Sequence, residues 1–214
     1  MGDRHQTLAA GLRADVRMLG NLLGETLVRQ HGPELLDLVE RVRSLTKRVR
    51  DASDPEGSIA AADELASLLD ETTIDETIQL VRAFSMYFSL ANVAEQEHRH
   101  DVAALSTDLA STTDLILDSD LDQQTIEDVI GRLDVRPVFT AHPTEAARRS
   151  VQSKTVEIAG LLRAARRPSA TPAEQARARR RIAELIDVMW QTDELRTTRP
   201  TPIDEARSVI HFFD

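Results

Sequence analysis

The chain has 214 residues, enough for one large or two small domains, and 36 acidic against 26 basic side chains give it a formal net charge of −10. A balance this acidic argues against general nucleic-acid binding, although it leaves room for a local basic pocket. The lack of cysteine excludes disulfide bonds and thiol chemistry, and no apolar run approaches the ~18 residues of a membrane span. We therefore expect a cytoplasmic protein that binds neither nucleic acid nor a membrane.

The first fifty residues have the periodicity of two amphipathic helices. Apolar residues recur at steps of three and four, which places them on one helical face, and Gly32-Pro33 divides them into two stripes. The stripes are Leu8, Leu12, Val16, Leu19, Leu23 and Leu27, then Leu35, Leu38, Val39, Val42, Leu45 and Val49. The short link between them predicts an antiparallel helical hairpin.

Further helices are expected up to residue 133. A polar loop over 51–58 leads to a short helix carrying Leu65, Leu68 and Leu69. Thr73-x-x-Glu76 is a capping box that begins a long helix, which we expect to end among residues 95–100. Two more helical segments are predicted, at about 102–117 and 122–133.

The stretch 136–152 differs from the rest of the chain. Residues 137–141 form a short β-prone run, and His142 precedes Pro143, which favours extended geometry for the histidine at the end of a strand. A helix is expected to begin at Pro143 and to carry Arg148 and Arg149 in its second turn. An imidazole, free backbone N–H groups and two guanidiniums would then converge on one spot, as a phosphate or carboxylate site requires.

The remaining residues predict three more elements. The helix after His142 should run to about Arg166, and a second capping box, Thr171-x-x-Glu174, begins a helix with Ile182, Leu185, Ile186, Met189 and Trp190 on its apolar face. Thr201-x-x-Asp204 begins a last helix, and the sequence stops at Asp214 without a capping residue, as in an interrupted helix. We place a soft boundary near Asp134, between a helical region at 1–134 and the start of a β/α unit at 135–214.

Two groups of charged residues are predicted to have structural roles. The arginine-rich part from 163 to 181 lacks interleaved aromatics, so we interpret it as two solvated helix ends around a loop. His98 and His100 lie on different sides of a helix, which makes them a poor metal pair. Glu95 and His98 can share a face, and we expect them to serve packing.

Four segments together resemble phosphoenolpyruvate carboxylases. Thr140-Ala141-His142-Pro143-Thr144-Glu145, followed by Arg148-Arg149-Ser150, is similar to the signature of that family. The other three blocks, in family order, are Leu19-Gly20-Asn21-Leu22-Leu23-Gly24-Glu25, the segment Phe88 to Arg99 with its Asn-x-Ala-Glu pattern, and Gln191-Thr192-Asp193-Glu194-Leu195-Arg196 with Arg199 to Glu205. Four blocks in order make a chance similarity very improbable.

The resemblance implies a fold, a reaction and a set of site residues. The fold class is mainly α, the helix-rich N-terminal part of an α/β (TIM-like) barrel enzyme with one short strand at about 137–141. The reaction joins phosphoenolpyruvate and bicarbonate to give oxaloacetate and phosphate in a homotetramer, with His142 catalytic. Arg148, Arg149 and Arg196 are expected to bind an anionic activator. The alternative is a structural role, with Arg148 and Arg149 on a solvated helix face and Arg196 paired with Asp193 or Glu194. The Mg²⁺ (or Mn²⁺) ion is expected on ligands outside this chain, since family members are several times longer. We expect an N-terminal fragment that is inactive alone.

Two alternatives belong to other functional classes. The chain could be a stand-alone helical interaction or regulatory module that keeps the His-Pro motif without the chemistry. It could also be an anion sensor that uses Arg148 and Arg149. A cooperative unfolding transition with a defined oligomer would favour the module, whereas aggregation and marginal stability would favour the fragment.

Overall fold

The computed structural model describes residues 2–52, 55–106, 114–116, 118–119, 121–134 and 148–193, together with 201, 203–204, 207 and 210. These residues are almost entirely helical, in agreement with the mainly α prediction. The expected strand at 137–141 lies outside the described residues, and the barrel stays a prediction. None of the described helices is both long and apolar enough to cross a membrane.

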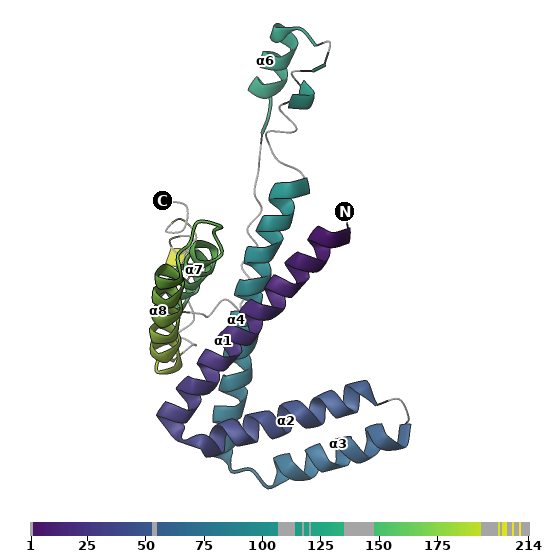
Figure 1. Cartoon of the computed structure of the whole chain (residues 1–214), viewed down its shortest axis with the longest axis vertical. Coiled ribbons are helices and arrows are strands. Elements are labelled where there is room, and N and C mark those ends of the chain that lie inside the picture. Colours follow the sequence, from purple (N-terminus) through teal and green to yellow (C-terminus); the bar gives the residue numbers. More distant parts are fainter. Residues whose placement is uncertain are drawn as a thin grey trace.

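Most of the described helices pack against one another in pairs (Figure 1). Their bounds are α1 (Gly2–His31), α2 (Pro33–Asp51), α3 (Pro55–Asp70), α4 (Ile74–Ser106), α6 (Gln123–Gly131), α7 (Arg149–Ala165) and α8 (Pro172–Trp190). α4 runs back alongside α1, α2 pairs with α3, and the hairpin of α7 and α8 packs on α1 and α4. α6 has no buried residue and lies beyond the end of α4.

The turn between α1 and α2 has the structure that the sequence predicts. Gly32 has a φ of 88°, in the left-handed region that glycine adopts without a steric penalty. Pro33 follows at the first position of α2, where its missing N–H costs no hydrogen bond. The two helices pack against each other, so the predicted hairpin is confirmed.

Two predicted helix ends are wrong. α3 begins at Pro55, inside the expected loop at 51–58, because this proline suits a first helical turn and the Ser58 hydroxyl donates to the Val49 carbonyl at 3.1 Å. α4 continues to Ser106 instead of ending among residues 95–100, because no glycine or proline interrupts it. The predicted segment at 102–117 therefore begins inside α4, and residues 107–113 lie outside the described residues.

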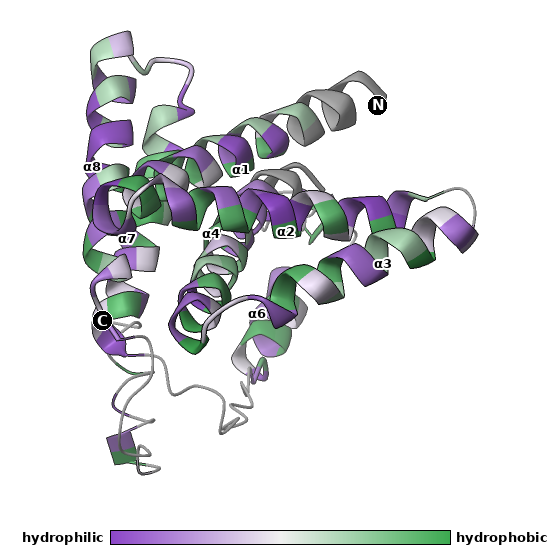
Figure 2. Cartoon of the chain, turned by 90° about the horizontal axis from the view of Figure 1, so that it is seen from below, coloured by the Kyte–Doolittle hydropathy of each residue, from purple (hydrophilic) through white to green (hydrophobic). Residues whose placement is uncertain are grey.

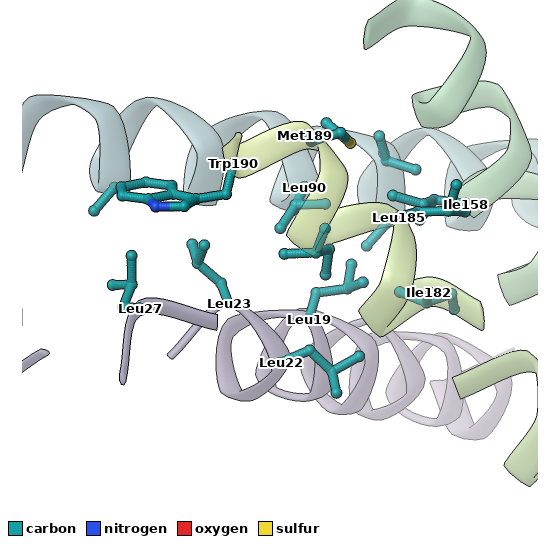
Figure 3. Close-up of a cluster of buried hydrophobic side chains, with 14 of the residues drawn as sticks. Leu19, Leu22, Leu23, Leu27, Leu90, Ile158, Ile182, Leu185, Met189 and Trp190 are labelled. Atoms are coloured by element: carbon teal, nitrogen blue, oxygen red, sulfur yellow. The ribbon is translucent and has the colours of Figure 1, made fainter. Parts of the chain in front are cut away.

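One hydrophobic core joins five helices (Figure 3). Its buried residues are Leu19, Leu22, Leu23 and Leu27 of α1, Leu35 of α2, Ala83, Leu90, Val93 and Ala94 of α4, Ile158 and Leu162 of α7, and Ile182, Leu185, Ile186, Met189 and Trp190 of α8. Burying each large side chain contributes about 1.5–3 kcal/mol. The core spans both sides of the boundary placed near Asp134, and that division into regions stays a prediction.

A smaller cluster holds α2, α3 and α4 together. Val42, Leu45, Leu68 and Leu80 form it, with Leu65 and Phe84 packed at its edge. Apolar and polar residues alternate around each of these helices in Figure 2, as amphipathic packing requires.

Both predicted capping boxes form in the structure, and the predicted helix start at Thr201 shows the same hydrogen bonds. In the first, the Thr73 backbone N–H donates to the Glu76 carboxylate at 2.8 Å, and the Glu76 N–H donates to the Thr73 hydroxyl at 3.3 Å. Thr171 with Glu174, and Thr201 with Asp204, repeat the same reciprocal pattern. The second box begins α8 and so positions the helix that carries much of the core.

Candidate functional site

The site predicted from the sequence is only partly described by the structure. His142 falls within 135–147 and Arg196 within 194–200, and both ranges lie outside the described residues. Their roles stay predictions. Arg148 and Arg149 are described, and they stand at the start of α7.

Arg148 is the N-cap of α7 and Arg149 is its first helical residue. The prediction that both lie in the second turn of a helix beginning at Pro143 is therefore wrong. The backbone of Arg148 is extended, with φ −69° and ψ 138°, so the helix does not continue back through this residue. Its carbonyl accepts the first bonds of α7, from the N–H groups of Val151 and Gln152. Both arginines thus stand at the positive end of the α7 dipole.

The start of α7 lies beside the end of α8, because the two helices run antiparallel. The Arg148 guanidinium is 3.9 Å from the Asp193 carboxylate, and both side chains are exposed. Asp193 belongs to the block at 191–196 that ends in Arg196. The structure therefore brings the described edges of two predicted site segments to the same end of the hairpin.

Trp190 anchors this end of the hairpin to the rest of the molecule. Its indole Nε1–H donates to His31 Nε2 at 2.9 Å, and the two rings meet edge to face. The Arg82 guanidinium donates to the Trp190 carbonyl at 2.6 Å and lies over the indole, 4.8 Å from the ring centroid. Residues of α1 and α4 thereby fix the point at which the chain enters the 191–196 block.

A buried ionic network, which the sequence analysis missed, joins α1, α4 and α7. Asp15 accepts from His98 at 2.9 Å and from Arg166 at 3.2 Å. Glu97 accepts two hydrogen bonds from Arg163, at 2.9 and 2.7 Å, and lies 3.7 Å from Arg166. The side chains of Glu97 and His98 are only 6% and 8% exposed.

This network corrects one interpretation and confirms another. Arg166 is 22% exposed and pairs across helices, so the α7 end of the arginine-rich segment is not simply solvated. His98 packs as expected, since its ring fills the space beside Gly11. The packing role predicted for Glu95 is wrong, because its side chain is half exposed and pairs with Arg99. A signal for the network was present in the sequence: Asp15 lies between Leu12 and Leu19 on an otherwise apolar stripe.

Thr26 and Asp187 form a second polar contact between α1 and α8. The Thr26 side chain is fully buried, and its hydroxyl donates to Asp187 at 2.7 Å. Arg29 donates to both oxygens of the same carboxylate, at 2.8 and 3.0 Å. These bonds fix the rotation of α8 against α1, and so the direction in which its C-terminal end points.

The chemistry available in the described residues is binding of anions by arginine. No group of three or more histidine, aspartate or glutamate side chains that could hold a metal ion occurs in the parts of the chain that the structure describes. The described buried imidazole, His98, is committed to Asp15. The predicted general acid or base, His142, is joined to Arg148 by five intervening residues.

Comparison with known proteins relates the chain to one family. A family model described as phosphoenolpyruvate carboxylase matches residues 12–214. Phosphoenolpyruvate carboxylases of Ectopseudomonas mendocina and Edwardsiella ictaluri are each 39% identical, over 207 and 202 residues, and that of Acinetobacter baumannii is 37% identical over 211 residues. These alignments cover 92%, 92% and 94% of this chain but 23%, 22% and 23% of the relatives, so the chain spans less than a quarter of their length. The chain belongs to the phosphoenolpyruvate carboxylase family.

Proposed function

We propose that this chain is the amino-terminal part of a phosphoenolpyruvate carboxylase, which converts phosphoenolpyruvate and bicarbonate to oxaloacetate and phosphate and so supplies the tricarboxylic acid cycle. The observation that carries the proposal is the family match, which runs through nearly the whole chain. The chain supplies less than a quarter of such an enzyme. For this reason we expect it to be inactive when isolated.

His142 is the proposed catalytic residue of the chain. The resemblance assigns the equivalent histidine to the breakdown of carboxyphosphate to carbon dioxide, next to the enolate of pyruvate. An imidazole suits this step because its pKa lies near the working pH, so it can give or take a proton. His142 lies outside the described residues, and its role rests on the resemblance of 140–150 to the family signature.

Arg148, Arg149 and Arg196 are the proposed anion site for an activator. Two structural features support the assignment. Arg148 and Arg149 stand at the N-terminus of α7, where the helix dipole adds to their charge. The Arg148–Asp193 contact places the start of the block containing Arg196 at the same helix end.

The divalent metal, Mg²⁺ or Mn²⁺, would polarise the substrate oxygens in the complete enzyme. We propose that its ligands lie in the remainder of the enzyme, as the family resemblance implies. That remainder, in a barrel and a homotetramer, would also cover the apolar stripe of α4. Ile74, Ile78, Val81 and Phe88 are 74%, 49%, 59% and 60% exposed along this stripe. The cytoplasmic location stays a prediction.

The proposal is tested by the rate of oxaloacetate formation from phosphoenolpyruvate and bicarbonate in the complete protein. We expect His142→Asn to lower this rate by about 10²–10⁴-fold, the usual contribution of an acid–base group. His5→Asn, which changes a histidine that precedes all four family segments in the sequence, should retain most of the activity. A folded His142→Asn enzyme with an unchanged rate would reject the catalytic role. A folded but inactive wild-type protein would favour the interaction-module alternative.

A further inference from the structure

The hairpin of α7 and α8 contains an open groove of about 400 Å³ at its closed end. This volume is within the range of small-molecule sites. The floor is apolar and made of short side chains, including Leu161 and Ala164 from α7 and Ala178 from α8. Figure 1 shows the hairpin to one side of α1 and α4, with the connecting turn at one end.

Three arginines line this groove. Arg167 comes from the turn after α7, and Arg177 and Arg181 come from one face of α8. Arg181 is paired with Glu157 and Glu184, so Arg167 and Arg177 with Glu174 leave the lining a net charge of 2 − 1 = +1, whereas the whole chain carries −10. A cationic hollow on an acidic molecule attracts small anions selectively.

The groove is already held in shape by contacts between its two walls. The Arg181 guanidinium donates to Glu157 of α7 at 2.8 Å and to Glu184 at 3.0 Å. The Gln175 side chain donates to the Ala165 carbonyl at 3.3 Å and closes the hairpin near the turn. Arg181 therefore holds the two walls of the groove together, and its guanidinium is occupied by these carboxylates.

Arg167 and Arg177 have no ion pair within the described part of the chain. Both are exposed, and the nearest acid on the groove, Glu174, is engaged by the Thr171 N–H at 2.8 Å and the Thr171 hydroxyl at 2.7 Å. These hydrogen bonds, with the charges of Arg177 and Arg167, hold the pKa of Glu174 below its ordinary value. Two guanidiniums thus border one hollow, and the capping carboxylate beside them is already occupied.

We propose that the groove at the α7–α8 turn binds a small organic dianion, with Arg167 and Arg177 as its ligands. Guanidinium groups bind carboxylate and phosphate oxygens in a planar, often bidentate geometry. The apolar floor fits a short carbon skeleton between two anionic groups. Inorganic phosphate and sulfate have no such carbon skeleton. This site is separate from the proposed activator arginines, because Arg148 lies at the opposite end of α7.

Calorimetric titration of the complete protein tests the site, with succinate, glycerol 3-phosphate and inorganic sulfate as dianionic probes. We expect saturable binding of succinate or glycerol 3-phosphate that is tighter than binding of sulfate. The ranking of the first two identifies the preferred group, carboxylate or phosphate. The double variant Arg167→Ala, Arg177→Ala should weaken this binding at least about tenfold, because it removes two charge-assisted hydrogen-bond partners.

Matched variants separate this site from bulk charge and from the activator arginines. Arg13→Ala with Arg17→Ala removes two exposed charges from α1 and should leave the affinity unchanged. Ala164→Leu keeps every charge but fills the floor of the groove, and should weaken the organic anions more than sulfate. If wild-type protein shows no saturable binding, or the Arg13, Arg17 control loses as much affinity as the groove variant, the proposal is wrong. If Arg148→Ala abolishes binding and the groove variant does not, the anion binds at the proposed activator site and the groove proposal is wrong.

Discussion

Replacing Glu97 with glutamine tests whether the buried ionic network holds α7 on α4. The Glu97 side chain is 6% exposed and accepts two hydrogen bonds from Arg163, with Arg166 3.7 Å away. Glutamine keeps one acceptor oxygen and loses the charge, so one charge-assisted bond and the attraction to Arg166 disappear. Such a bond contributes about 1.5–3 kcal/mol to stability. Arg163 is 59% exposed and can bind water in place of the lost acceptor, which keeps the loss of stability toward the lower end of this range. We therefore expect a loss of about 2 kcal/mol.

Amide hydrogen exchange in the complete protein measures this loss locally. Peptides from 149–165 should exchange about 30-fold faster in Glu97→Gln, since each 1.4 kcal/mol corresponds to a factor of ten. The matched control is Glu95→Gln on the same helix, where Glu95 pairs with Arg99 at 2.7 Å but the side chains are 47% and 77% exposed. That exposed pair is worth only about 0.3–0.5 kcal/mol, or roughly a twofold change. Equal effects of the two substitutions would refute the reasoning.

Two further predictions concern a helix packing contact and a helix cap. A Cβ added at Gly11 would lie 3.0 Å from His98 Cε1, so Gly11→Ala should destabilise the protein. A Cβ added at Gly160 meets nothing within 4 Å, so Gly160→Ala should stabilise the protein by up to about 1 kcal/mol. Thermal unfolding of both variants measures these changes. A Gly11→Ala protein as stable as Gly160→Ala would contradict this packing. The pKa of Glu174 lies below its ordinary 4.5, chiefly through the backbone N–H of Thr171, so its contribution to stability is present above pH 4.5 and is lost as the pH falls through the lowered pKa. The unfolding temperatures of wild type and Glu174→Gln should therefore converge as the pH falls from about 6 through the lowered pKa of Glu174, and a difference that does not change with pH would exclude the linkage.

The helices and most of the core could be predicted from the sequence because their signals are local. The apolar spacing of Leu19, Leu23 and Leu27 is preserved in the helix, and all three are buried. Capping boxes such as Thr171 with Glu174 involve residues three apart, so their pattern alone specifies the contact.

Contacts between distant segments could not be predicted in the same way. Asp15 and His98 are 83 residues apart, and nothing in the local pattern of either residue specifies the other. The N-cap position of Arg148 could not be predicted either, because arginine is not among the residues that favour an N-cap and its side chain makes no capping hydrogen bond. His142 and Arg196 were identified by the resemblance, and their placement lies outside the described residues.

The central claim is that this chain forms one part of a phosphoenolpyruvate carboxylase. The most direct test compares oxaloacetate formation from phosphoenolpyruvate and bicarbonate by the complete protein and by the isolated 214-residue chain, each purified to homogeneity. We predict turnover by the complete protein, dependent on a divalent metal, and none by the isolated chain. A complete, folded protein that forms no oxaloacetate, or an isolated chain as active as the complete protein, would contradict the claim.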